Sequence, residues 1–324
     1  MSSKPCGFNR NKGITLVELL IVIIVIGIIA AILLPALGGS RDGRSRRTTC
    51  ANKIRNIALA CINYESSNEQ FPAAVSYRGE SFLVRILPML DIAPLYDDFR
   101  ANPDDNSAKN DLATVELDYL RCDSTPANDN ESDHFAGSTS HYTGSAGPAS
   151  SNLEDKYGSA EFSYQTDGFG PVGLRGLFSP TVAENADAND PFARATKNGV
   201  SAIKVSDGLS NTLAIVETSR SDFDNGKRTF TNNRPRWPWG VMEGNPTKVN
   251  WSRSIARTVN SYDDVPHQEI PFHELPISSN HPGGAHVVNG DGSTRFVSDD
   301  IDLIVLQAVG GIDEGDEENQ DLDR

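Results

Sequence analysis

Residues 16–37 form an apolar run, LVELLIVIIVIGIIAAILLPAL, in which Glu18 is the one charged residue. Counted from Ile14 to Leu37, the segment has 24 residues. As a helix it would be about 36 Å long, compared with about 30 Å for the hydrocarbon of a bilayer. The apolar core of an ordinary secretory signal has only about 7–15 residues. We therefore predict that residues 14–37 form a single membrane-spanning helix.

Basic residues flank this run on both sides. The short polar leader, residues 1–13, carries three basic residues, and the positive-inside rule places such a leader in the cytoplasm. A second basic cluster, from Arg41 to Arg47, follows the run closely. Counting charges alone would therefore favour the opposite orientation, with the leader outside, and the topology has to be read from another feature.

Glu18 is an unusual residue for such a segment. A carboxylate at the centre of a transmembrane helix costs about 2.5–3.5 kcal/mol, and less near a helix end. One interpretation is that Glu18 is retained because it meets a positive group of another subunit. The other is that Glu18, one turn into the helix, reaches back to the membrane interface.

Residues 13–18 read GITLVE, and this segment resembles the type IV prepilin cleavage and N-methylation site. The resemblance implies that a prepilin peptidase cleaves the chain after Gly13 and that the new amine on Ile14 is methylated. Phe or Met is usual at this first mature position, so Ile14 is a departure. The resemblance also implies that Glu18 meets the N-terminal amine of a neighbouring subunit and sets the filament register. Pro35 matches a proline that bends this helix in the family.

Residues 38–65 are predicted to form a glycine joint followed by an amphipathic helix. Three glycines lie among the arginines of residues 38–43, and each costs about 0.8–1 kcal/mol in a helix interior relative to Ala. From Thr48 to Glu65 apolar residues recur with helical spacing, and we expect this stripe to pack against the head. The apolar residues of the stripe are Ile54, Ile57, Ala58, Cys61 and Ile62.

Residues 66–312 are predicted to form an α+β head, because short apolar segments alternate there with Gly, Pro, Asn, Asp and Ser. Residues 82–90 indicate a buried helix or a pair of strands. Residues 115–121 indicate a strand that leads into Cys122. Residues 123–170 are rich in Ser, Gly, Asn and Asp, and we expect loops with little regular structure there.

The C-terminal part of the head carries the clearest strand signals. Residues 212–216 are predicted to form a strand that follows the turn at Asp207-Gly208. Residues 285–298 are predicted to form a β-hairpin around the sequence NGDG, since Asn-Gly and Asp-Gly accept a positive φ. Residues 313–324 carry seven acids and one Arg, which indicates an acidic disordered tail.

His281 is separated by nine residues from Asp291-Gly292. With the apolar N-terminus, this spacing resembles the prepilin-type processing-associated H-x(9)-D-G domain, a bacterial family whose uncharacterised head follows a prepilin N-terminus. The resemblance implies a pilin-like fold, α+β in class, with a long N-terminal transmembrane and amphipathic helix packed on an antiparallel β-sheet head with long loops. The other segments that resemble this family are residues 50–64, 71–72, 120–122, 207–212, 217 and 281–284.

The chain has four cysteines, Cys6, Cys50, Cys61 and Cys122. No two of them form a C-x-x-C pair, so a structural zinc site of the usual spacing is not expected. Removal of the leader would remove Cys6, and an exported protein can keep a disulfide. Our preferred pair is Cys50 with Cys122, with Cys61 buried on a helix face. The alternative is that no disulfide forms, since sequence does not fix connectivity.

Asp207, Glu217, His281 and Asp291 form a candidate metal site. Carboxylates in loops rich in Gly and Asp suit Ca²⁺, and the resemblance adds that major pseudopilins bind calcium in the head. The alternative is that both aspartates are turn residues that bond their own backbone, with His281 locking the hairpin by a hydrogen bond. No other cofactor is expected.

Catalysis is not expected of the head. The sequence contains no G-x-S-x-G and no P-loop, and His273-Glu274 lacks the second His of a zincin helix. The chain beyond residue 55 carries 20 basic and 42 acidic residues, which argues against binding to nucleic acid. Trp237, Trp239 and Trp251 are candidates for a sugar-binding or partner-binding surface, or for caps of the core.

These features favour a prepilin-like or pseudopilin-like structural subunit, which would assemble into a pilus or a type II secretion-like filament. We expect it in the cytoplasmic membrane as a single-pass protein with its head on the exported side. Its expected partners are membrane lipid, prepilin peptidase, and like subunits or other pilins. The alternative is a membrane-anchored surface module that binds calcium or a polysaccharide through its head.

Overall fold

The computed structural model divides the chain into two compact units, residues 1–45 and 46–324, each described here by itself. The described residues are 15–37, 41–75, 80–101, 111–125, 138–152, 156–158, 163–166, 170–179, 199–224, 227–231, 237–238, 241–242, 245–249, 252–261 and 274–313. The predicted leader, Gly13 and Ile14 lie outside these residues, as does all but the first residue of the predicted acidic tail.

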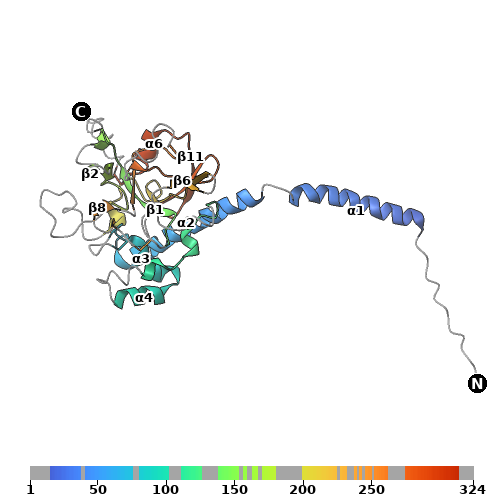
Figure 1. Cartoon of the computed structure of the whole chain (residues 1–324), viewed down its shortest axis with the longest axis horizontal. Coiled ribbons are helices and arrows are strands. Elements are labelled where there is room, and N and C mark those ends of the chain that lie inside the picture. Colours follow the sequence, from blue (N-terminus) through green and yellow to red (C-terminus); the bar gives the residue numbers. More distant parts are fainter. Residues whose placement is uncertain are drawn as a thin grey trace, which may run out of the picture. The chain divides into compact units, whose positions relative to one another are not determined.

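Helix α1 (Leu16–Leu37) contains the whole apolar run (Figure 1). The large apolar side chains from Leu16 to Ile29 are 46–80% exposed. Pro35 lies within α1, two residues before its end. Among the described residues, none of the helices combines the length and the apolarity that crossing a bilayer requires. The membrane span over residues 14–37 therefore stays a prediction.

Helix α2 (Arg41–Asn68) begins seven residues before the predicted start at Thr48. Gly43 lies inside this helix, and residues 38–40 lie outside the described residues, so the flexible joint over residues 38–43 stays a prediction. No atom outside the helix comes within 4 Å of a Cβ built at Gly43. The glycine is thus tolerated there at the ordinary cost of about 1 kcal/mol.

The head is built on a five-stranded sheet with the strand order β11-β10-β4-β1-β9. Neighbouring strands are antiparallel except β1 and β9, which are parallel, so the predicted purely antiparallel sheet is wrong at this edge. The bounds of these strands are β1 Tyr142–Pro148, β4 Leu213–Glu217, β9 Ser252–Ile255, β10 Gly284–Asn289 and β11 Thr294–Ser298.

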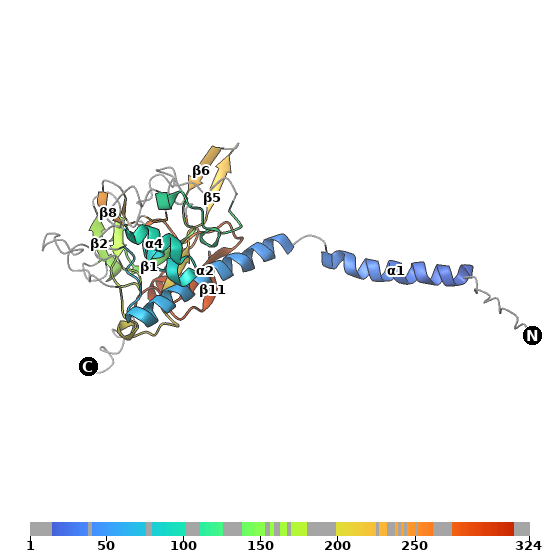
Figure 2. The same cartoon turned by 90° about the horizontal axis from the view of Figure 1, so that it is seen from below.

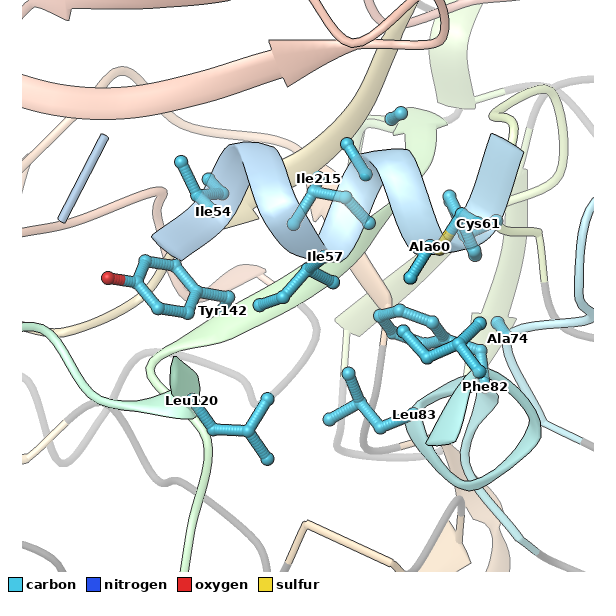
Figure 3. Packing of buried hydrophobic residues seen from close by; sticks show 14 of the residues in the cluster. Ile54, Ile57, Ala60, Cys61, Ala74, Phe82, Leu83, Leu120, Tyr142 and Ile215 are labelled. Carbon is cyan, nitrogen blue, oxygen red and sulfur yellow. The ribbon is translucent and has the colours of Figure 1, made fainter. Parts of the chain in front are cut away.

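The apolar stripe of α2 packs into the main core, as its helical spacing predicts. Ile54, Ile57 and Cys61 are at most 1% exposed. In Figure 3, Ile57 points into a group of side chains that includes Tyr142 and Leu120. Burial of a side chain of this size contributes about 1.5–3 kcal/mol. The amphipathic helix is therefore an integral part of the head.

Helix α6 (Leu303–Ala308) covers the other face of the sheet. Ile215 of β4 belongs to the core cluster beneath α2, whereas its neighbour Val216 packs in a second cluster with Leu306 of α6. Successive residues of a strand point to opposite faces, so the sheet is buried between α2 and α6. The side chain of Asp302 caps α6 by accepting a hydrogen bond from the Ile304 amide at 2.9 Å.

Shorter elements complete the head, and the β5–β6 hairpin stands out from the rest of the head in Figure 2. The helical elements are α3 Phe82–Arg85, α4 Ala93–Ala101 and the 3₁₀ turns η1 Leu87–Leu90, η2 Asp118–Leu120, η3 Lys156–Gly158 and η5 Ala202–Lys204. The paired strands are β2 Ser163–Thr166 with β3 Gly170–Gly173, β5 Ser221–Asp224 with β6 Lys227–Thr231, and β7 Val241–Met242 with β8 Asn245–Val249.

Two segments differ from the sequence-based prediction. Residues 115–121 contain the 3₁₀ turn η2 instead of a strand. Residues 123–170, predicted as loops, contain β1, which lies between β4 and the edge strand β9 in the sheet. Its sequence, YTGSAGP, is rich in glycine because other parts of the chain press against it: a Cβ at Gly144 would lie 2.5 Å from the Cβ of Phe178. The small residues allow close packing in this strand.

The strand at residues 212–216 and the hairpin at residues 285–298 are confirmed as β4 and the β10–β11 pair. Of the NGDG residues only Gly292 has a positive φ, +83°. The hairpin tip packs on the loop before β4, where the Gly290 amide donates to the Thr212 carbonyl at 2.9 Å. The two segments that stand out in sequence are therefore neighbours in the fold.

Candidate functional site

Thr15 and Glu18 form a reciprocal cap at the start of α1. The Glu18 carboxylate accepts hydrogen bonds from the Thr15 amide and hydroxyl, both at 2.9 Å, and the Glu18 amide donates to the Thr15 hydroxyl at 3.3 Å. This arrangement is the capping box, whose sequence signature is Thr-x-x-Glu before an apolar run. This signature is present at residues 15–18, so the cap could have been predicted from the sequence. Within one chain, Glu18 has a local structural partner.

The second candidate is a buried cluster around a disulfide in the head. Cys50 of α2 and Cys122 are joined by this disulfide, the pair preferred on sequence grounds. Nε2 of His281 lies 3.3 Å from Sγ of Cys122 and 3.5 Å from Oε1 of Glu217. All four residues are at most 4% exposed. The cluster therefore brings together a helix, a loop and the end of a strand that are far apart in the sequence.

Glu217 ends β4 and is fully buried. Its Oε1 accepts a hydrogen bond from the Ser219 hydroxyl at 2.6 Å, and its Oε2 accepts one from the His286 amide at 3.0 Å. Burial raises the pKa of Glu217 to about 7, while these two hydrogen bonds act in the opposite direction. Burial also lowers the pKa of His281 to about 4. The contact between the two is therefore that of a neutral imidazole with a carboxyl group, and not an ion pair.

His281 and His286 lie edge to face, with ring centroids 5.1 Å apart. Burial, and then the charges of His281 and Arg47, lower the pKa of His286 to about 4. The guanidinium of Arg47 lies 3.3 Å from the ring centroid of Phe296, which also contacts both histidines. At least one arginine of the basic cluster, Arg47, is thus part of the head and makes a cation–π contact with Phe296.

The four residues predicted to bind calcium do not all meet. Glu217 and His281 are in contact, but Asp207 and Asp291 are absent from the group of possible metal ligands found among the described residues. The carboxylate of Asp291 instead accepts a hydrogen bond from the Ser293 amide at 2.8 Å, two residues further on. For Asp291 the alternative interpretation, a turn residue bonded to its own backbone, describes the structure.

A polar pocket of about 780 Å³ borders the cluster. His281 and Ser124 are among its lining residues, with Arg220, Asn260 and Asp299. The hydroxyl of Ser124 lies 3.0 Å from Nδ1 of His281. The conspicuous histidine of the H-x(9)-D-G pattern therefore stands between the disulfide and this pocket, while Gly292 lies in the hairpin turn.

Two of the remaining candidates, Cys61 and Trp237, lie in the hydrophobic core. Cys61 is 1% exposed and is not in the disulfide, as the sequence analysis preferred. Trp237 is fully buried, and its indole N–H donates to the Val115 carbonyl at 3.0 Å, so it belongs to the core. Trp239 and Trp251 lie outside the described residues.

Comparison with known proteins finds matches for the N-terminal segment and for the head. Residues 8–34 match the prokaryotic N-terminal methylation motif. The chain is 28% identical over 79 residues to type II secretion system core protein G of Pectobacterium carotovorum subsp. carotovorum. This match covers 22% of the chain and 50% of the length of that relative. No solved structure matches the chain.

The methylation motif is typical of pilin-type subunits, which prepilin peptidase processes and which are anchored in the membrane and exported. Residues 43–303 match a single family model, described as "Protein of unknown function (DUF1559)". This match runs from the first turn of α2 to the first residue of α6 and includes every strand of the five-stranded sheet. The chain therefore belongs to this family of heads and carries a prepilin-type N-terminus.

Proposed function

We propose that the chain is a pilin-like structural subunit, cleaved after Gly13 by a prepilin peptidase and anchored in the cytoplasmic membrane by residues 14–37. Its head is exported and has a non-enzymatic role. The observation that carries the proposal is the sequence GITLVE, which leads directly into the apolar helix α1. The match of residues 8–34 to the methylation motif supports the same assignment.

The surface of α1 supports membrane anchoring and assembly. Its apolar side chains from Leu16 to Ile29 are exposed in a single chain. Covering each such side chain contributes about 1.5–3 kcal/mol, so a series of this length needs an apolar environment. Lipid provides it before assembly, and the like helices of neighbouring subunits provide it in a filament.

Glu18 would change partner on assembly. In one chain its carboxylate, in the first turn of α1, accepts hydrogen bonds from Thr15. Cleavage after Gly13 creates a positive amine on Ile14. In a filament the carboxylate would meet the amine of a neighbouring subunit, which offsets the cost of a charge in an apolar setting and sets the register.

The N-terminus of the mature protein tests the cleavage. The chain is expressed with and without a prepilin peptidase, and the mass of the N-terminal peptide is measured. We expect a peptide that begins at Ile14, with or without one methyl group, only when the peptidase is present. Gly13→Val should abolish cleavage, and Gly7→Val, a matched change within the same leader, should leave it intact. An intact leader on membrane-bound protein in the presence of active peptidase would contradict the proposal.

A second candidate function is a membrane-anchored binding module, and the polar pocket beside His281 favours it. Serine, threonine and asparagine side chains line this pocket with Arg220, which suits a polyhydroxylated ligand such as a saccharide. Crosslinking of membranes from the native host distinguishes the two functions. A ladder of homotypic crosslinks that Glu18→Ala weakens supports the subunit, whereas saccharide binding without a ladder supports the binding module.

A further inference from the structure

Four side chains around the Cys50–Cys122 disulfide offer metal-ligand atoms. One atom from each of Cys50, Cys122, Glu217 and His281 lies within 4.8 Å of all the others. Nε2 of His281 is 3.3 Å from the sulfur of Cys122 and 3.5 Å from Oε1 of Glu217. Metal–ligand bonds of about 2.0–2.3 Å at tetrahedral angles put ligand atoms about 3.3–3.8 Å apart. Both distances from His281 match such a site.

In the disulfide, the two sulfur atoms are bonded to each other and are not thiolate ligands. We propose that reduction of this disulfide converts the cluster into a site for one Zn²⁺ ion, held by Cys50, Cys122, His281 and Glu217. Two thiolates, an imidazole and a carboxylate suit Zn²⁺, whereas Ca²⁺ takes oxygen ligands. Zinc binding of this kind is independent of whether the chain assembles with other pilins.

The surroundings of the cluster already orient these ligands. The Asp123 amide donates a hydrogen bond to Sγ of Cys50 at 3.1 Å, a contact that strengthens when the sulfur carries a negative charge. The hydroxyl of Ser124, 3.0 Å from Nδ1 of His281, fixes the ring so that Nε2 faces the cluster. The second oxygen of Glu217 accepts a hydrogen bond from a backbone amide. Three of the four proposed ligands, Cys50, His281 and Glu217, thus each have a hydrogen-bond partner outside the cluster.

Charge and access also fit a bound cation. Two thiolates and a carboxylate carry three negative charges, so the site with Zn²⁺ has a net charge of about −1. The guanidinium of Arg47 stacks on Phe296, whose ring contacts His281, and it places a compensating positive charge nearby. The polar pocket lined by His281 and Ser124 provides a route from solvent.

Electrons and protons balance in the conversion between the disulfide form and the zinc-bound form. A dithiol reduces the disulfide with two electrons and two protons and itself becomes a cyclic disulfide; Zn²⁺ then displaces the two thiol protons. In the reverse direction, a disulfide reagent accepts two electrons from the thiolates and two protons from water and leaves as two thiols, and Zn²⁺ is released as the Cys50–Cys122 bond forms. Because the cytoplasm keeps thiols reduced and exported proteins keep disulfides, we expect zinc before export and the disulfide after it.

Co²⁺ serves as the probe, because its spectrum reports thiolate ligands and tetrahedral geometry. The full chain in detergent is reduced with dithiothreitol, freed of reductant under nitrogen and titrated with Co²⁺. We expect one equivalent to bind, with thiolate-to-cobalt charge-transfer bands and the visible bands of a tetrahedral site, which one equivalent of Zn²⁺ removes. The oxidised chain should show neither set of bands. A reduced chain without these bands, or an oxidised chain with them, would overturn the assignment.

Four variants identify the ligands. Cys122→Ser should lose at least half of the charge-transfer absorbance, because one of the two thiolates is gone. Cys61→Ala, a matched change at the buried cysteine outside the cluster, should keep the bands unchanged. His281→Gln should weaken binding of Co²⁺ and shift the visible bands. Ser124→Ala, which removes only an outer partner, should keep the spectrum and weaken affinity by about tenfold. Circular dichroism of each reduced variant reports its fold, and unchanged Co²⁺ affinity in both His281→Gln and Ser124→Ala would contradict the ligand set.

Discussion

Glu217 links the chemistry of a single residue to the stability of the head. Its carboxyl group is fully buried, and its pKa is raised from 4.5 to about 7. Between these pH values the folded chain holds a proton that the unfolded chain has released. The contribution of Glu217 to the free energy of unfolding therefore falls as the pH rises, by up to about 3 kcal/mol at alkaline pH.

Glu217→Gln should stabilise the oxidised chain at alkaline pH, because the amide is neutral at every pH. Its single carbonyl oxygen keeps one of the two acceptor roles, towards the Ser219 hydroxyl or the His286 amide, and its NH2 group cannot take the other. His281 and His286 have lowered pKa values, so they make stability rise with pH up to their unfolded values near 6.5, but they do so in both proteins. The variant should therefore gain about 2–3 kcal/mol relative to wild type between pH 5 and pH 8. Urea unfolding of the full chain in detergent with EDTA measures this difference. A difference that does not depend on pH would show that Glu217 is ionised in the folded head.

Gly144 tests the close packing around β1. A Cβ at this position would lie 2.5 Å from the Cβ of Phe178, a side chain that is itself buried. Gly144→Ala should therefore destabilise the head by about 1–3 kcal/mol through overpacking. The matched change Gly43→Ala, in open space inside α2, should be neutral or stabilising by up to about 1 kcal/mol. Equal effects of the two changes on the urea midpoint would contradict the packing of Phe178 on β1.

At the residue scale, local features are readable from the sequence and the buried cluster is not. The Thr15–Glu18 cap involves residues three positions apart, and its signature is written in the sequence. Cys122 and His281 are 159 positions apart, and their contact exists only because α2, β4 and the loop before β10 are packed together. No periodicity or spacing encodes such a contact, so Glu217 and His281 were grouped with the wrong aspartates.

At the scale of elements, α2 follows most directly from the sequence. Its buried face repeats with a helical period, and all but one of the five apolar residues in the predicted stripe are at most 2% exposed. Strand β1 could not be recognised in the same way. Its two glycines are there because Phe178 and Gly176 pack against the strand, and the sequence of β1 alone does not contain that information. The parallel pairing of β1 with β9 likewise depends on long-range contacts.

The two faces of α2 provide a matched test. Ile57 is fully buried beneath the helix, and Leu59, two residues later, is 41% exposed. Ile57→Ala should lower the free energy of unfolding by about 2–5 kcal/mol, because it removes buried methyl groups and leaves a cavity. Leu59→Ala should cost about 1 kcal/mol or less. Trp237, which is buried in the same core, reports unfolding by fluorescence. If Leu59→Ala costs as much as Ile57→Ala, the assigned buried face is wrong.

At the scale of the whole molecule, the chain joins a prepilin-type N-terminus to a head of the DUF1559 family. The methylation motif covers residues 8–34 and the family model covers residues 43–303, so the two matches meet close to the boundary between the compact units. Helix α2 extends across this boundary and also carries Cys50. The disulfide therefore ties the segment that follows the proposed anchor to the loop that leads into β1.

This disulfide should control the stability of the head as a whole. Cys50 and Cys122 are 72 positions apart, and closing a loop of that length lowers the entropy of the unfolded chain by the equivalent of about 4 kcal/mol. Reduction in the presence of EDTA should therefore lower the free energy of unfolding by an amount of this order. Zn²⁺ at a free concentration about 100-fold above its dissociation constant should restore about 2.7 kcal/mol, because it binds the folded reduced chain. Urea unfolding of the full chain measures the three states. If reduction lowers the free energy of unfolding and Zn²⁺ restores none of it, the reduced head does not bind zinc at this cluster. If the reduced chain in EDTA is as stable as the oxidised chain, the packing of α2 on the sheet holds the head together without the disulfide.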